Sequence, residues 1–60
     1  MGDKWIKEVL VEEHEDGTKT YTAINNEGDS KTVTGEYSSY GVFQNDYNDK
    51  AKDEAIKGVL

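Results

Sequence analysis

An Asp-Gly pair between two runs of strand-forming residues constrains this chain more than any other feature of its sequence. Residues 9–15 and 18–24 flank Asp16 and Gly17, and both runs contain strand-forming residues, among them two valines in the first and three threonines, a tyrosine and an isoleucine in the second. Asp-Gly favours a two-residue type I′ turn, in which both central residues have positive φ angles. The sequence therefore predicts a β-hairpin. Its expected pairs are Glu15 with Thr18, Val11 with Thr22, and Val9 with Ile24.

Two further signals extend this hairpin into an antiparallel meander. Residues 25–29 favour a type I turn with Gly28 in the left-handed conformation, which closes a three-residue hairpin loop. A third strand is expected from residue 30 to about residue 37, and residues 42–43 either prolong it or form a short fourth strand. Residues 5–15 also show the apolar spacing of a helix. A strand is favoured there, because the hairpin turn that follows needs an extended partner.

The last segment of the chain predicts a helix. Asp46 or Asn48 can act as its N-cap, and a set of apolar residues then shares one helical face. These residues are Ala51, Ala55, Ile56, Val59 and Leu60. We therefore expect a single α+β domain over residues 1–60, with an antiparallel β-meander of three or four strands and one C-terminal α-helix packed on one face.

In the predicted register, both faces of the sheet carry apolar side chains. One face would hold Leu10, Tyr21, Ala23 and Val33, with Tyr37 able to join them, and the other Val9, Val11, Thr22 and Ile24. One helix can cover only one face, and apolar residues make up only 33% of the chain. A second covering surface is therefore expected, supplied by another protein or by a second copy of the chain in a homodimer.

The net charge argues against several classes of function. Seven lysines, no arginine and thirteen acidic residues give a formal charge of −6. Such a surface repels the phosphates of nucleic acids and anionic membranes, so neither is an expected direct partner. The longest apolar run, residues 9–11, is too short to span a bilayer. Residues 1–3 lead directly into charged residues without a signal peptide, so a cytoplasmic location is expected.

No catalytic or metal-binding pattern emerges from the sequence. There is no cysteine, and the one histidine, His14, stands among acidic residues beside the predicted turn, where an exposed role is favoured over acid–base catalysis. Residues 46–50 open like a calcium loop, but the fifth, sixth and twelfth positions hold Lys50, Ala51 and Lys57 instead of the required ligands and glycine. We expect a non-enzyme without metal or cofactor. A small hydrolase or ligand-binding protein that uses His14 is the least favoured class.

The aromatic residues form the candidate binding site. Tyrosine and tryptophan combine a large contact area with a polar tip, and they are enriched at protein interfaces. The residues concerned are Tyr37, Tyr40, Phe43 and Tyr47, together with Trp5. The same residues could instead form the core of a chain that is short of apolar side chains, or stack on a sugar. We predict a protein-interaction module that binds another protein through these aromatic residues or through the uncovered sheet face.

The carboxylates suggest an alternative function. Four of them, Glu12, Glu13, Glu15 and Asp16, lie at the predicted hairpin. Carboxylates spaced regularly on a small sheet could imitate nucleic-acid phosphates and occupy the basic cleft of a DNA- or RNA-binding protein, with a fast, electrostatically steered association. Small acidic inhibitors encoded by phages are similar in size and charge. The alternative is therefore an acidic inhibitor that mimics nucleic acid.

Overall fold

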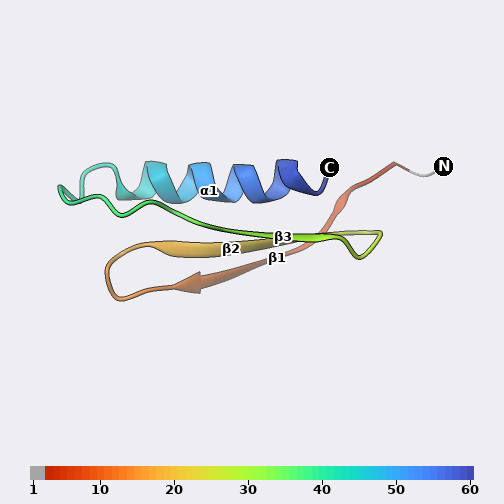
Figure 1. Cartoon of the computed structure of the whole chain (residues 1–60), viewed down its shortest axis with the longest axis horizontal. Helices are drawn as coiled ribbons and strands as arrows, with labels where there is room; N and C mark the ends of the chain where they lie inside the picture. Colours follow the sequence, from red (N-terminus) through yellow and green to blue (C-terminus); the bar gives the residue numbers. More distant parts are fainter. Residues whose placement is uncertain (1–2) are drawn as a thin grey trace.

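Three antiparallel strands and one helix form two layers (Figure 1). The computed structural model describes residues 3–60; Met1 and Gly2, on which the expectation of no signal peptide partly rests, lie outside them. The strands are β1 (Ile6–Glu13), β2 (Lys19–Asn25) and β3 (Ser30–Thr34), in the sheet order β1-β2-β3. Helix α1 (Gln44–Gly58) packs on β2 and β3. The predicted α+β meander with one C-terminal helix is confirmed.

Several boundaries differ from the prediction. Residues 42–43 form a turn before the helix, so the described residues contain no fourth strand. Helix α1 begins at Gln44, which is before both predicted caps, and the residue at its N-cap makes no side-chain capping hydrogen bond. Residues 6–13 are a strand, as favoured, and a bulge separates Ile6 from Glu8.

The second hairpin has the predicted loop. The Asn25 N–H donates to the Asp29 carbonyl over 3.0 Å, and the Gly28 N–H donates to the Asn25 carbonyl over 3.2 Å. Gly28 has a φ of 89°, which is the left-handed conformation that closes a three-residue loop after a type I turn. The prediction for residues 25–29 is therefore confirmed.

The first hairpin has the same kind of loop, which makes the predicted two-residue turn wrong. The His14 N–H donates to the Thr18 carbonyl over 2.9 Å, and the Gly17 N–H donates to the His14 carbonyl over 3.1 Å. A type I′ turn needs a positive φ at Asp16, but within residues 3–60 only glycines have one. Asp16 Oδ1 instead accepts hydrogen bonds from the Thr18 N–H at 3.0 Å and the Thr18 hydroxyl at 2.6 Å. This local bonding favours the longer loop.

The longer loop shifts the register of β1 by one residue. Val11 pairs with Tyr21 instead of Thr22, and Val9 pairs with Ala23 instead of Ile24. A slip of one residue moves every side chain of a strand to the other face. The predicted faces were therefore wrong for β1: Val9 and Val11 lie on the helix-covered face, and Leu10 lies on the open face.

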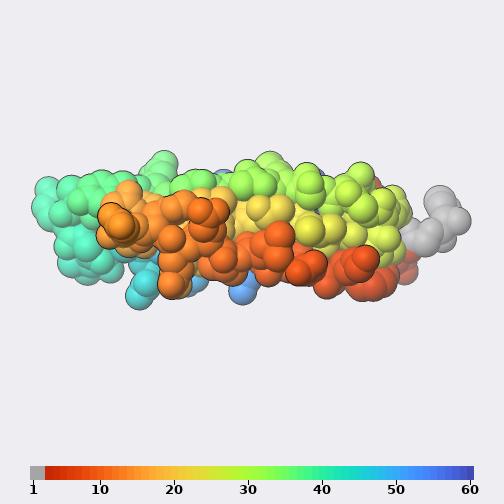
Figure 2. All heavy atoms as spheres, turned by 90° about the horizontal axis from the view of Figure 1, so that it is seen from below, coloured from red at the N-terminus to blue at the C-terminus, as the bar shows by residue number. Residues whose placement is uncertain are grey.

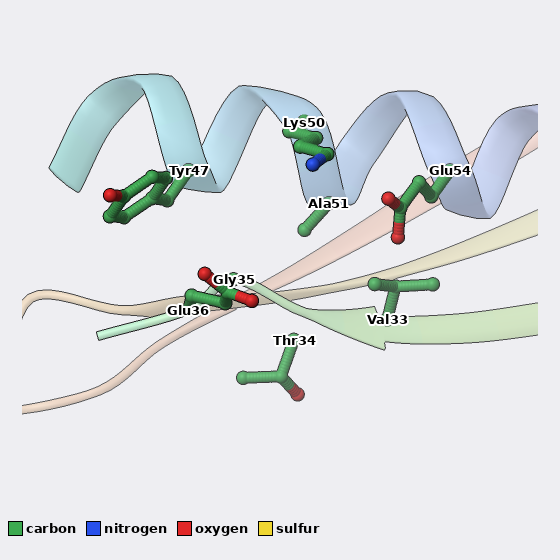
Figure 3. A pocket seen from close by; sticks show the side chains of 8 residues that line it. All are labelled: Val33, Thr34, Gly35, Glu36, Tyr47, Lys50, Ala51 and Glu54. Atoms are coloured by element: carbon green, nitrogen blue, oxygen red, sulfur yellow. The ribbon is translucent and has the colours of Figure 1, made fainter. Parts of the chain in front are cut away.

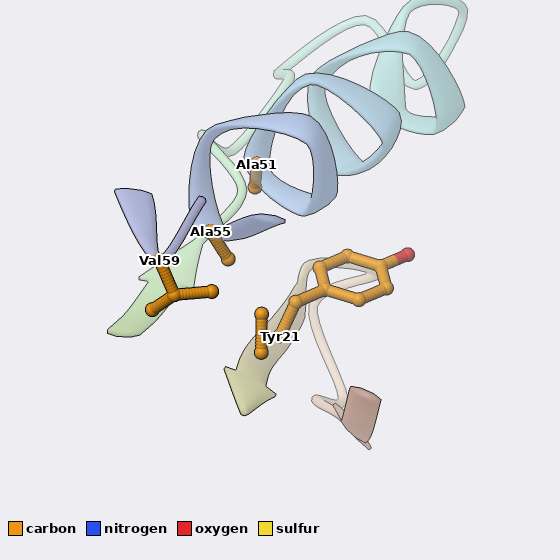
Figure 4. Close-up of a cluster of buried hydrophobic side chains, with 5 residues drawn as sticks. Tyr21, Ala51, Ala55 and Val59 are labelled. Carbon is orange, nitrogen blue, oxygen red and sulfur yellow. The ribbon is translucent and has the colours of Figure 1, made fainter. Parts of the chain in front are cut away.

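The apolar core is small and lies between β2 and the helix (Figure 4). Its buried members are Tyr21, Ala23, Ala51, Ala55 and Val59, and Ile6, Val9, Val33 and Ile56 pack against them. Alanines at the contact let the helix lie close to the strand. The predicted helix face is confirmed except at Leu60, which is 56% exposed.

Asparagine side chains complete the interior where apolar residues are few. Asn25 is fully buried, and its Nδ2 donates to the Val59 carbonyl over 2.7 Å, which ties the second hairpin to the end of the helix. Its Oδ1 accepts hydrogen bonds from the Glu27 and Asp29 N–H groups, both at 2.9 Å. Asn48 makes a corresponding connection at the other end of the helix, beside the candidate site.

Candidate protein-binding site

The residues 37–43, here called the tyrosine loop, form an exposed apolar surface at one end of the molecule, where the first hairpin loop also lies (Figure 1). Tyr40 is 84% exposed, Val42 76%, Tyr37 61% and Phe43 50%. The interpretation of these aromatic residues as the core is therefore wrong. The aromatic residue of the core is Tyr21, which is only 6% exposed.

The side chain of Gln44 holds the backbone of the loop. Its Nε2 donates to the Glu36 carbonyl over 2.7 Å, and its Oε1 accepts from the Ser38 N–H at 2.8 Å. Gln44 and Ser38 are buried, while the side chains of Tyr37 and Tyr40 are exposed. The loop thus presents large side chains from an anchored backbone, an arrangement that reduces the entropy lost on binding.

Asn48 joins the first hairpin to the helix at this end of the molecule. Its Oδ1 accepts hydrogen bonds from the Lys19 N–H and from Gln44 Nε2, both at 3.2 Å. Its Nδ2 donates to the Gly17 carbonyl over 3.1 Å. Gly35 packs so closely that a Cβ there would overlap Asn48 Oδ1. The first hairpin and the helix are therefore connected through one side chain, against which Gly35 packs, although the sequence suggested a capping role for Asn48.

Tyr47 lies beside the loop at a small cleft between β3 and the helix (Figure 3). Its ring is half-buried, with its centroid 6.5 Å from that of Phe43. The cleft has a volume of about 60 Å³. Its lining residues are Val33, Thr34, Gly35, Glu36, Tyr47, Lys50, Ala51 and Glu54. This space is far below the several hundred Å³ of a typical cofactor site, but it can accept one side chain of a partner.

Trp5 does not join the other predicted aromatic residues. The backbone N–H of Trp5 donates to Asn26 Oδ1 over 2.9 Å, and the Trp5 carbonyl accepts from the backbone N–H of Asn26 at 3.0 Å. Asn26 belongs to the second hairpin loop, at the opposite end of the sheet from the tyrosine loop (Figure 1). The prediction of one cluster that includes Trp5 is therefore wrong, although Trp5 is itself 56% exposed.

The four carboxylates of the alternative function do not share one face. Glu12 lies on the open face opposite Thr20, whereas Glu13 lies on the other face with its Oε1 3.5 Å from the Nζ of Lys19. Glu15 and Asp16 lie in the first hairpin loop. The pKa of Asp16 is lowered, first by the hydrogen bond from the hydroxyl of the following threonine and then by the one from its N–H.

The open sheet face brings His14 beside a hydroxyl that the predicted register had placed differently. His14 Nε2 lies 2.6 Å from Thr20 Oγ1, which is 2.8 Å from Thr34 Oγ1. Thr22 and Thr32 form a second such pair at 2.9 Å. Within residues 3–60 no carboxylate or carbonyl hydrogen-bonds the imidazole, so nothing orients it as a catalytic base. Side chains alternate between the two faces of a sheet, so the observed register places His14 and Thr20 on the same face. The predicted register, which was wrong by one residue, placed them on opposite faces.

The described residues give no sign of a metal centre or of a membrane-spanning helix. No three or more histidine, cysteine or acidic side chains come together within residues 3–60 as a metal site would require. Over the same residues, no helix combines the length and the apolar character needed to cross a bilayer. Comparison of the chain with protein-family models, curated protein sequences and solved structures gives no match.

Proposed function

We propose that this chain is a non-enzymatic interaction module that binds another protein through the tyrosine loop and the adjoining cleft. The observation that carries the proposal is the exposure of four large side chains, Tyr37, Tyr40, Val42 and Phe43, in one anchored loop. Within residues 3–60 only five apolar residues are buried, so burial of these four side chains would add stability. Instead they face solvent together, which is typical of an interaction surface.

The chemistry of the loop fits a protein partner. Exposed tyrosines supply contact area and a hydroxyl that can hydrogen-bond at the edge of an interface. The cleft beside Tyr47 offers apolar contact from Val33 and Ala51, with the charged residues Glu36, Lys50 and Glu54 around it. One side chain of the partner would fill the cleft while the tyrosines cover the surrounding surface.

Affinity capture with matched variants tests this proposal. The immobilised chain is exposed to a lysate of its source organism, and the captured protein is identified and titrated. Tyr40→Ala and Phe43→Ala should each weaken capture by roughly tenfold or more, as expected for central interface aromatics. Trp5→Ala is the control, because Trp5 is similarly exposed but is hydrogen-bonded to the second hairpin loop, at the other end of the sheet. Equal effects of Tyr40→Ala and Trp5→Ala would contradict the assignment of the loop.

The salt dependence of capture separates this function from mimicry of nucleic acid. Binding through the tyrosine loop should change little between low and high salt. A mimic would lose its partner at high salt, because screening weakens the attraction between exposed charges. It would also lose affinity in Glu12→Gln and Glu15→Gln more than in Tyr40→Ala. These two results together would contradict binding through the tyrosine loop and would favour an acidic inhibitor that mimics nucleic acid.

A further inference from the structure

The outer edge of β1 is an uncovered strand edge with apolar residues at its middle. β1 is the first strand of the order β1-β2-β3, and the helix packs on the other two strands. Figure 2 shows β1, in red and orange, along one long border of the open sheet face. Leu10 is 48% exposed and Val11 54%. A long edge strand with exposed apolar residues is a template for pairing with another strand.

The hairpin hydrogen bonds show which backbone groups of β1 point outward. The His14 N–H donates to the Thr18 carbonyl after the loop, and the His14 carbonyl accepts from the Gly17 N–H of the loop, so both groups of His14 point toward the hairpin partner. Hydrogen-bonded pairs alternate along an antiparallel ladder, so Glu12, Leu10 and Glu8 bond β2. The N–H and carbonyl groups of Val9 and Val11 therefore point away from the sheet, and they are available to a further strand.

We propose that the occupant of this edge is a second copy of the chain, with the two β1 strands paired antiparallel across a two-fold axis at Leu10. The two sheets then form one sheet of six strands. Leu10 faces Leu10 of the second copy, and Val9 faces Val11 of the second copy on the helix side. At each end of the pairing, Glu13 lies opposite the bulged Lys7. This surface is self-complementary, as a two-fold interface requires.

Neighbouring registers are less favourable. An axis at Val9 would place Leu10 opposite Glu8, and an axis at Val11 would place Leu10 opposite Glu12. Only the axis at Leu10, among these three, pairs each residue of 9–11 with an apolar residue. Its unfavourable pairs are Glu8 with Glu12 of the second copy, on the solvated open face, where opposed like charges are destabilising. Added salt should therefore strengthen the dimer, because it screens this repulsion.

A second copy also fits the composition of the chain. Val9 and Val11 continue the core face of the sheet past Tyr21, but the helix packs mainly on β2 and β3, and Val11 remains 54% exposed. A second β1 strand would bring two more valines into that layer from the other copy. The pairing thus adds apolar contact to a molecule in which residues 3–60 include only five buried apolar side chains.

Disulfide trapping tests the register. The chain has no cysteine, so Leu10→Cys introduces a single thiol. In the proposed dimer, residue 10 forms a non-hydrogen-bonded pair with itself, with Cα atoms about 4.5 Å apart, which is within the range of a disulfide. Leu10→Cys should therefore form a covalent dimer under mild oxidation. Glu12→Cys is the control. Residue 12 lies on the same strand and face, but in the proposed dimer it lies opposite residue 8 of the second copy, so the two introduced thiols are four residues apart along the strands. Equal crosslinking of both variants would overturn the register.

Sedimentation velocity over a concentration series tests the edge itself. Glu12→Lys turns both like-charge pairs, Glu8 with residue 12 of the other copy, into opposite-charge pairs. The dimer should become about tenfold tighter, because each of the two pairs contributes up to about 1 kcal/mol. Val11→Pro removes an outward N–H, which an edge strand tolerates. Val11→Pro should weaken the dimer about tenfold or more, because the dimer loses two hydrogen bonds, one from each copy, of about 1 kcal/mol each. Val11→Thr keeps the N–H and serves as its control, and circular dichroism verifies the fold of each variant.

The results separate this dimer from the proposed function. Tyr40→Ala should leave dimerisation unchanged, because the tyrosine loop is not part of the β1 edge. A dimer that persists in Val11→Pro, or a chain that stays monomeric at millimolar concentration in both the unmodified and Glu12→Lys forms, overturns the proposal.

Discussion

Replacing Asn48 with alanine should strongly destabilise the chain, because that side chain carries three hydrogen bonds, two of which join the helix to the first hairpin. It accepts from the Lys19 N–H and from Gln44, and it donates to the Gly17 carbonyl. A net value of about 0.5–1.5 kcal/mol for each of the three bonds gives a loss of about 1.5–4.5 kcal/mol. At 0.05–0.15 kcal/mol per residue, the whole chain has only about 3–9 kcal/mol. The substitution should therefore remove a large part of the stability.

The loss can be measured by thermal and urea unfolding followed by circular dichroism. For a domain of this size, 1 kcal/mol corresponds to roughly 4–8 °C in Tm, so we expect a fall of at least about 6 °C. Asn45→Ala is the matched control, since Asn45 lies in the same helix with an exposed side chain and should change the free energy of unfolding by less than about 0.5 kcal/mol. Similar values for the two variants would refute the role assigned to Asn48.

Three other substitutions test the packing and the hairpin. Gly35→Ala should lower the Tm by several degrees, because its Cβ would overlap Asn48 and the neighbouring backbone cannot move aside cheaply. Gly58→Ala should instead be neutral or raise the free energy of unfolding by up to about 1 kcal/mol, because alanine favours the helix and the Cβ meets only the mobile end of a lysine side chain. Asp16→Asn should reduce the loss of stability in acid: the pKa of Asp16 is lowered from 3.8 by its bonds from Thr18, so its contribution is complete above that pH and lost as the pH falls below it. Unfolding curves of Asp16→Asn and the unmodified chain, compared from neutral pH to below 3.8, measure the difference, and parallel losses would contradict this assignment.

The sequence was sufficient to predict the elements and their order, but not the register of the first hairpin. Gly17 marks the turn correctly, since only a glycine accepts the positive φ that closes it. Whether Asp16 or Glu15 begins the loop depends on competition between a type I′ turn and the bonds from Thr18 to the Asp16 carboxylate. Local propensity does not decide that competition, and one residue of difference exchanges the two faces of β1.

The candidate site was predictable in part. Tyr37, Tyr40 and Phe43 stand close together in the sequence, so their place in one loop follows from the chain itself. The separation of Trp5 depends on its hydrogen bonds to Asn26, a residue twenty-one positions away, and no sequence pattern indicates such a pairing. The role of Asn48 was missed for a related reason: its partners come from a hairpin loop whose register was not known.

The small core implies an unusual thermal behaviour for this chain. The increase in heat capacity on unfolding comes from newly hydrated apolar surface, and exposure of polar groups reduces it. Within residues 3–60, five apolar residues are buried, three of them alanines, and they share the interior with buried asparagine and glutamine side chains. The heat capacity increment per residue should therefore be lower than in most domains. The curve of stability against temperature should be correspondingly shallow, so that cooling weakens this chain less than a protein with a larger apolar interior.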